Sequence, residues 1–149
     1  MNWILYIHLI AAMAWIGGSI FMFALGILLK DKEKQHAIYP IVGPIFGYFE
    51  IASLIVLLIS GTWIAYDAGL LTSLIEGDHS KIVDLLRIKL WVVLVIVIAS
   101  LLHFYIALKT NTIQRSKLEN LISRGSSLLI FFLNLVVVYY AILIRSIVN

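Results

Sequence analysis

The sequence contains no cysteine, few charged residues and only two prolines. The absence of cysteine excludes disulfide bonds, thiolate zinc sites, iron–sulfur clusters and cysteine nucleophiles. Any bound metal would therefore need histidine, methionine, lysine, tyrosine, carboxylate or backbone ligands. Charged residues make up 13% of the chain, which is about half of their usual share in a soluble domain. Together with a hydrophobic fraction of 62%, this shortage of charge indicates a membrane protein.

Four apolar segments are long enough to cross the hydrocarbon core of a bilayer, which takes about 20 helical residues. Each is expected to be helical, because a segment in lipid must satisfy its own backbone hydrogen bonds. The first lacks a basic leader and a small-residue cleavage site, so we expect a retained helix rather than a signal peptide. The chain is therefore predicted to be one all-α domain, an antiparallel four-helix transmembrane bundle with up-down-up-down connections. The predicted helices cover residues 3–29, 41–66, 85–108 and 126–144.

The basic residues are concentrated in two of the links between these segments. Residues 30–43 and 109–125 hold seven of the eleven lysines and arginines, whereas residues 67–84 hold one lysine and four acidic residues. The positive-inside rule then places the first and third links in the cytoplasm and both termini on the periplasmic side of a bacterial inner membrane. Because the basic residues flank apolar segments, nucleic acid is not an expected partner. We also expect a short interfacial helix at Ser80–Lys89 that runs into the third span, and an amphipathic piece at Ile113–Ile122.

Polar side chains within apolar spans are costly in lipid, so each one requires a structural or a functional reason. At 100° per residue, His8, Trp15 and Gly18 lie on one face of the first predicted helix. A histidine on a helix is a common ligand of haem or metal, and its structural alternative is a hydrogen bond to a neighbouring helix. Asn134, near the middle of the fourth segment, is expected to make a hydrogen bond between helices.

Glu50, in the cytoplasmic half of the second segment, has two interpretations. It is either paired with Arg124 or His103 to fasten helices together, or it is a proton relay or metal ligand. His103 lies at a similar depth on the third segment, so Glu50 and His103 form a candidate proton path. His8 lies at the opposite depth, so His8 and His103 are not expected to bridge one haem. His103 is instead a candidate ligand of a separate group.

A histidine and three basic residues gather near the outer surface of the predicted bundle: His8, Arg87, Lys89 and Arg145. This set suits a planar macrocycle with two carboxylates, because the histidine can ligate iron and the basic residues can pair with propionates. Copper is the competing metal, but copper(I) prefers cysteine and methionine ligands. Met13 and Met22 point in opposite directions on the first helix, so they favour no thioether site.

The motif H-x6-W-x2-G, formed by His8, Trp15 and Gly18, occurs in the run HLIAAMAWIGGSIF, and the third segment begins RIKLWVVLVIV. In length, number of spans and these motifs, the chain resembles the small four-helix membrane proteins that include the HemJ-type protoporphyrinogen oxidases. Its first segment is also similar to the membrane domain of CopD-type copper-resistance proteins. The HemJ-type resemblance implies haem b binding and oxidation of protoporphyrinogen IX, with His8 and Lys89 as the matching residues.

The sequence supports three functional hypotheses. The first is a haem b-binding protein with a redox role that acts on a tetrapyrrole substrate or an electron-transfer partner, and a protoporphyrinogen oxidase-like oxidoreductase is one form of this hypothesis. The second is a copper-handling membrane protein with His8 and Glu50 as ligands, and the third is a non-catalytic assembly factor. A small bundle also leaves helix faces for a homo-oligomer. In the first hypothesis His8 is the axial ligand, Trp15 lines the pocket, and the carboxylates are held by Arg87, Lys89 and Arg145.

Overall fold

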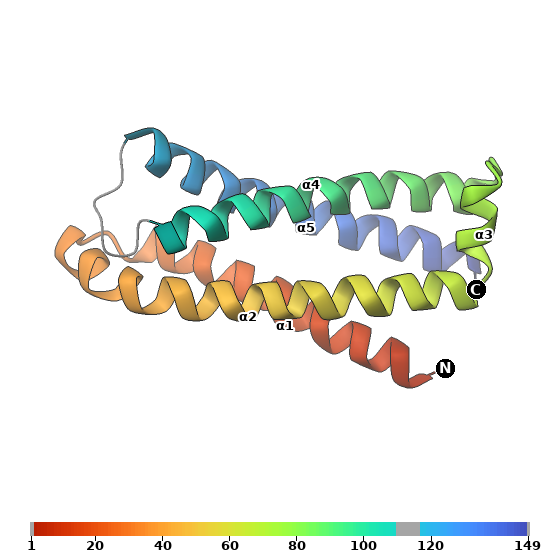
Figure 1. Cartoon of the computed structure of the whole chain (residues 1–149), viewed down its shortest axis with the longest axis horizontal. Coiled ribbons are helices and arrows are strands. Elements are labelled where there is room, and N and C mark those ends of the chain that lie inside the picture. Colours follow the sequence, from red (N-terminus) through yellow and green to blue (C-terminus); the bar gives the residue numbers. More distant parts are fainter. Residues whose placement is uncertain (1, 110–116, 149) are drawn as a thin grey trace.

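The computed structural model describes residues 2–109 and 117–148, which form four long helices and one short helix (Figure 1). Their bounds are α1 (Asn2–Leu28), α2 (Lys32–Asp67), α3 (Leu70–Ile75), α4 (Lys81–Lys109) and α5 (Lys117–Val148). The long helices alternate in direction, and α3 lies at the end of the bundle where both chain termini are found. The segments Trp3–Leu28, Lys32–Asp67, Lys81–Lys109 and Gly125–Ile147 are long and apolar enough to span a membrane. The predicted all-α bundle is therefore confirmed, and the protein is a multi-pass membrane protein.

The bundle consists of two antiparallel helix pairs, α1 with α2 and α4 with α5. The pairs meet where α1 contacts α5 and where α2 contacts α4, so α1 and α4 lie diagonally across the bundle from each other. The first half of α1 diverges from α2 toward the N-terminus (Figure 1). This square arrangement lets polar groups on α1 and α4 face each other through the interior.

The observed α2 begins at Lys32, well before the predicted start at residue 41. The carboxylate of Asp31 caps this helix by accepting a hydrogen bond of 3.0 Å from the backbone N–H of Glu33. Pro40 and Pro44 consequently lie inside α2 rather than at its start. Each proline lacks a backbone N–H and therefore removes one backbone hydrogen bond from α2. The Asp31 cap stabilises the turns that precede the two prolines.

The links agree with the sequence prediction in one place and differ from it in another. The segment Ser80–Lys89, predicted as a helix that runs into the third span, is helical from Lys81 and continues into α4 without a break. The short helix α3 was not predicted, and it lies between Gly69 and Gly77, whose positive φ angles of 75° and 77° allow the tight turns on either side. Of the predicted amphipathic piece Ile113–Ile122, residues 113–116 lie outside the described residues and the rest belongs to α5.

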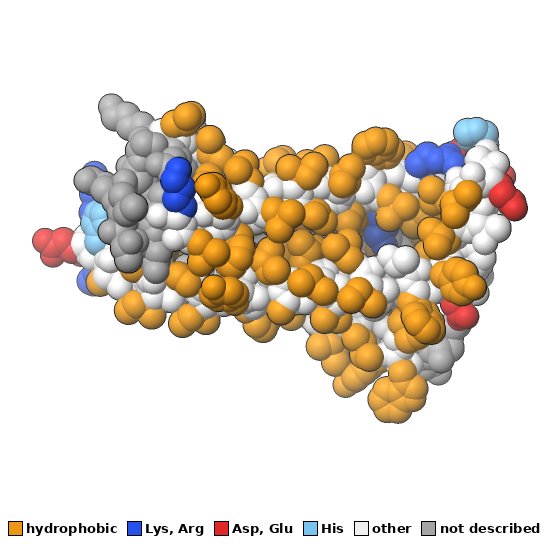
Figure 2. Space-filling model, viewed as in Figure 1, with side chains coloured by type: hydrophobic (Ala, Val, Ile, Leu, Met, Phe, Trp, Pro, Cys, Tyr) orange, Lys and Arg blue, Asp and Glu red, His pale blue; other side chains and the backbone are white. Residues whose placement is uncertain are grey.

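Charged side chains gather at the two ends of the bundle, and hydrophobic side chains cover the length between them (Figure 2). One basic side chain is an exception, because it lies recessed in a hollow among hydrophobic ones toward the α3 end. Large side chains such as Ile98 and Phe132 are more than half exposed on the long helices. Such surfaces are expected where helices contact lipid rather than water.

The core lies near the middle of the bundle and draws on all four long helices. We define the Trp15 layer as the buried residues Trp15, Leu54, Ile96, Ala99 and Ile130. The Trp15 indole donates a hydrogen bond of 2.8 Å to the Asn134 side-chain oxygen, and the Asn134 amide nitrogen donates one of 3.2 Å to the Ser19 hydroxyl. The predicted interhelical hydrogen bond of Asn134 is therefore confirmed, and it joins α5 to α1.

Candidate functional site

His8 lies on α1, about two turns from the Trp15 layer toward the α3 end, and it is half-buried. Its Nδ1 is 2.8 Å from the hydroxyl oxygen of Ser60 on α2. The ring packs against Gly61, where an added Cβ would come within 3.1 Å of His8 Cε1. The Nδ1–Cε1 edge of the imidazole therefore faces α2.

The hydrogen bonds of Ser60 favour one of the two neutral tautomers of His8. The Ser60 oxygen lies 2.6 Å from the carbonyl oxygen of Val56, and a carbonyl can only accept. The single hydroxyl proton is therefore used in that bond, and the Ser60 oxygen accepts from Nδ1–H of His8. In the neutral ring this tautomer leaves a lone pair on Nε2. Metal-ligating histidines commonly have their other ring N–H bonded in this way, which fixes the ring orientation.

Lys89 reaches the same depth from α4. His8 and Lys89 each lie seven residues, or about 10 Å, toward the α3 end from a residue of the Trp15 layer on their helices, Trp15 and Ile96. Lys89 is half-buried. Within the described ranges no acidic side chain forms an ion pair with Lys89. We define the His8 layer as His8, Ser60, Gly61 and Lys89.

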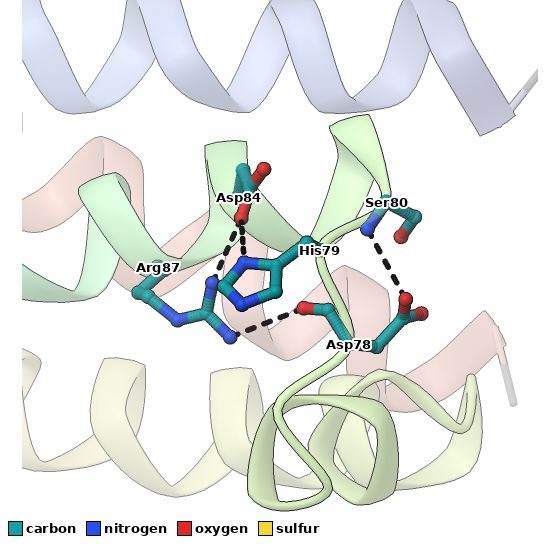
Figure 3. A network of polar contacts seen from close by, with 5 residues as sticks. All are labelled: Asp78, His79, Ser80, Asp84 and Arg87. Atoms are coloured by element: carbon teal, nitrogen blue, oxygen red, sulfur yellow. Dashed lines mark hydrogen bonds and ion pairs between the residues drawn. The ribbon is translucent and has the colours of Figure 1, made fainter.

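The other predicted basic residues are placed differently. Arg87 donates a hydrogen bond of 2.8 Å to the carboxylate of Asp84 and one of 3.2 Å to the carbonyl oxygen of Asp78 (Figure 3). His79 also contacts the Asp84 carboxylate, at 3.5 Å, so Arg87 fastens the link before α4. Arg145 is exposed in the last turn of α5. The structure thus places Lys89 at the depth of His8, and it places Arg87 in a separate surface network.

Trp15 is only 3% exposed, and its ring is packed among core residues rather than along an open wall. It forms the boundary beneath the His8 layer. Ser60, by contrast, was not singled out from the sequence. Its only signal there is a hydroxyl within an apolar span at the depth of His8, and the contact joins residues 52 positions apart.

An apolar groove of about 370 Å³ opens toward lipid between α1 and α2. It is lined by Ile4, Ile7, Val56, Ile59, Ser60 and Trp63. Two of these residues, Val56 and Ser60, belong to the hydrogen-bonded chain that ends at His8. The groove therefore extends to Ser60, the hydrogen-bond partner of His8.

Glu50 lies on the other side of the Trp15 layer. Its carboxylate rests over Gly18 of α1, where an added Cβ would be 3.7 Å from the Glu50 Oε1. Among the residues that the structure describes, Glu50 makes no hydrogen bond and no ion pair, so the expected pairing with His103 is not found. The side chain of Arg124, the other expected partner, lies outside the described part of the chain. His103 itself is half-buried on α4.

Ser100 shares the depth of Glu50. The ring of Phe104 on α4 fills the position that a Cβ at Gly47 of α2 would occupy, so these two residues face each other. Ser100 and Glu50 each lie about one turn from that contact toward the α3 end. Ser100 is 4% exposed, and its hydroxyl has no hydrogen-bond partner within residues 2–109 and 117–148. We define the Glu50 layer as Gly18, Glu50 and Ser100.

The described residues contain no group of three or more histidine, aspartate or glutamate side chains that could together hold a metal ion. A bare copper or zinc ion takes most of its ligands from such side chains. Haem differs, because the porphyrin supplies four iron ligands and the protein adds one or two. One oriented imidazole therefore fits haem better than it fits copper.

Comparison of the chain with protein-family models, curated proteins and solved structures finds no match to any of them. The resemblance to HemJ-type and CopD-type proteins therefore stays a prediction. The function is therefore inferred from the two polar layers and from the groove beside the first of them.

Proposed function

We propose that the protein is a haem b-binding protein of the bacterial inner membrane with a redox role. The observation that supports this most strongly is the hydrogen-bonded chain from His8 through Ser60 to Val56, which leaves Nε2 of His8 ready to ligate iron. Lys89, half-buried and without an ion pair among the described residues, is suited to a propionate. The apolar groove would cover the hydrophobic edge of the macrocycle.

Each residue has a distinct task in this proposal. Ser60 holds the His8 ring in one orientation, and Gly61 gives the ring room against α2. Lys89 offsets the negative charge of a carboxylate that enters the low-dielectric interior. The Trp15 layer closes the site from below and keeps water away from it. When bound, haem would supply the one-electron chemistry, and oxidation of a tetrapyrrole is the finer form of the activity that the HemJ-type resemblance favours.

The orientation in the membrane is part of the proposal. Basic residues occupy the link between α1 and α2 and the end of α4, at the end of the bundle opposite α3. The positive-inside rule places that end in the cytoplasm and both termini with α3 in the periplasm. Because the chain has no cysteine, single cysteines introduced as Lys32→Cys and Ser80→Cys report the sidedness directly. In intact spheroplasts an impermeant maleimide should label only Ser80→Cys, and labelling of Lys32→Cys alone would reverse the assignment.

The visible spectrum of the purified protein tests haem binding. Protein produced with ample haem should show a Soret band and reducible α and β bands. His8→Ala should lose or shift these bands, whereas His79→Ala, which removes an exposed histidine from the link, should leave them unchanged. A colourless wild-type protein that takes up no added haem, or identical spectra for His8→Ala and wild type, would reject the proposal. Binding of copper by a protein that shows no Soret band would favour copper handling instead.

A further inference from the structure

The Glu50 layer holds two polar groups that the described residues leave without partners, the Glu50 carboxylate and the Ser100 hydroxyl. The two groups lie on adjacent helices, α2 and α4, and at the same depth. An unpaired carboxylate within a membrane span is costly as an anion, and an unpaired buried hydroxyl adds a further cost. Both groups therefore need a partner that the described side chains do not supply.

The number of available oxygen atoms limits what can bind there. A desolvated sodium ion needs several oxygen ligands, and the Glu50 layer offers one carboxylate and one hydroxyl. A proton needs only one oxygen. Gly18 brings the α1 backbone close to the carboxylate without adding a ligand, so the chemistry of the layer favours a proton.

Packed side chains separate this layer from the α3 end of the bundle. Glu50 lies beyond the Trp15 layer from the α3 end, and that layer is packed with buried side chains from all four long helices. We propose that Glu50 is a proton-binding site, served by Ser100, that exchanges protons with water at the end of the bundle opposite α3. The site has its own geometry, and the inference does not depend on haem binding at His8.

The charged groups around Glu50 are few. On α1 the residues of this half of the span are uncharged, and on α2 the nearest titratable side chain, Tyr48, is exposed. On α4 the nearest is His103, which is half-buried and has an interaction partner of its own. On α5 the charged residues of this end have side chains outside the described set: Lys117, Glu119 and Arg124. A proton is therefore the simplest charge compensation that the described surroundings offer to Glu50.

Dicyclohexylcarbodiimide is a suitable probe, because this apolar reagent reacts with protonated carboxyl groups in membranes and leaves a stable N-acylurea. The full-length protein in liposomes should be modified at Glu50, as located by peptide mass spectrometry, and labelling should decrease as the pH rises. Glu50→Gln should remove the label and Glu50→Asp should retain it. Absence of labelling in wild type would overturn the proposal, and so would protection of Glu50 by sodium chloride at constant pH.

The direction of access is tested with a pH difference across the liposome membrane, in vesicles whose protein orientation has been measured. The labelling rate should follow the pH on the side opposite α3, and a rate that follows the α3 side would overturn the proposed access. Ser100→Ala should shift the labelling curve to higher pH, because the variant lacks the hydroxyl that, in this proposal, turns to the carboxylate when the proton leaves; an unchanged curve would remove Ser100 from the site. His8→Ala should label as wild type does, so failure of the haem proposal and failure of this one are separate results.

Discussion

The His8 layer and the Glu50 layer lie on opposite sides of the Trp15 layer, and they differ in how their polar groups are paired. In the first, the His8 Nδ1 is bonded to Ser60, which is bonded in turn to the α2 backbone. In the second, neither Glu50 nor Ser100 has a hydrogen bond within the described residues. An imidazole ring that is oriented by hydrogen bonds suits a ligand that must be bound in one orientation. Oxygen atoms without hydrogen bonds instead suit a proton that binds and is released.

The comparison depends on the separation of the two layers. The Trp15 ring, together with its hydrogen bond to Asn134, occupies the centre of the bundle between them. Sites that share no partners usually respond to substitutions independently. Variants in one layer should therefore leave the other layer unchanged, unless they alter the Trp15 layer itself.

Removal of the Trp15 ring should have the largest effect. Trp15→Ala removes a buried aromatic side chain and leaves the Asn134 side-chain oxygen without its hydrogen bond from the indole. We expect this substitution to lower the free energy of unfolding by about 3–5 kcal/mol. The substitution should also remove the barrier that the Trp15 layer forms between Glu50 and the α3 end of the bundle. Carbodiimide labelling of Glu50 should then respond to the pH on both sides of the membrane. Unfolding in mixed micelles and the labelling assay measure the two effects. Trp63→Ala, at an exposed position on α2, is the control, and equal losses in both variants would contradict the barrier role.

A substitution that disturbs the packing of α2 against α4 beside the Glu50 layer should have the next largest effect on stability. A Cβ at Gly47 would lie 2.5 Å from the Phe104 ring, so Gly47→Ala forces the helices or the ring to move. We expect a loss of about 1–3 kcal/mol, typical of overpacking. Phe104→Leu in the same chain should recover part of this loss in a double-mutant cycle. Additive losses would show that the two residues do not meet.

Loss of the hydroxyl of Ser60 should affect the His8 layer alone. Ser60→Ala removes the acceptor for Nδ1–H, and we expect a stability loss of about 1 kcal/mol and a haem affinity about 10–100-fold lower. Ser60→Thr should restore most of the affinity because it keeps the hydroxyl. Haem titration followed at the Soret band is the measurement, and Thr62→Ala on the exposed side of α2 is the control. An unchanged affinity in Ser60→Ala would show that the relay does not orient the ligand.

The sequence predicted helix faces better than helix ends. The 3.6-residue period placed His8, Trp15 and Gly18 on the inner face of α1, where the structure has them half-buried or buried. It failed at the start of α2, because a helix with a good cap can continue through Pro40 and Pro44, and local preference does not show this. Helix faces follow from the local repeat, whereas a boundary depends on contacts that the repeat does not contain.

The candidate site was only partly visible in the sequence for the same reason. The pairing of Arg87 with Asp84 is a local contact between residues three apart, which their spacing on a helix allows. The contact of His8 with Ser60 instead depends on how α1 and α2 align. The free Ser100 hydroxyl appears only when every neighbour is in place. Depth along each helix was predictable, but the pairing of groups across helices was not.

The smallest effect comes from a matched pair of glycines, one in each layer. A Cβ at Gly61 would lie 3.1 Å from the His8 ring, a contact that requires the ring to give way by a few tenths of an ångström. A Cβ at Gly18 would lie 3.7 Å from the Glu50 carboxylate, an ordinary van der Waals distance. Gly61→Ala should therefore shift the haem bands slightly and weaken haem binding by less than Ser60→Ala does. Gly18→Ala should leave the carbodiimide labelling of Glu50 unchanged. If Gly18→Ala is the more disruptive variant, the Glu50 layer is packed as tightly as the His8 layer, and the contrast between a fixed ring and an exchangeable carboxyl is lost.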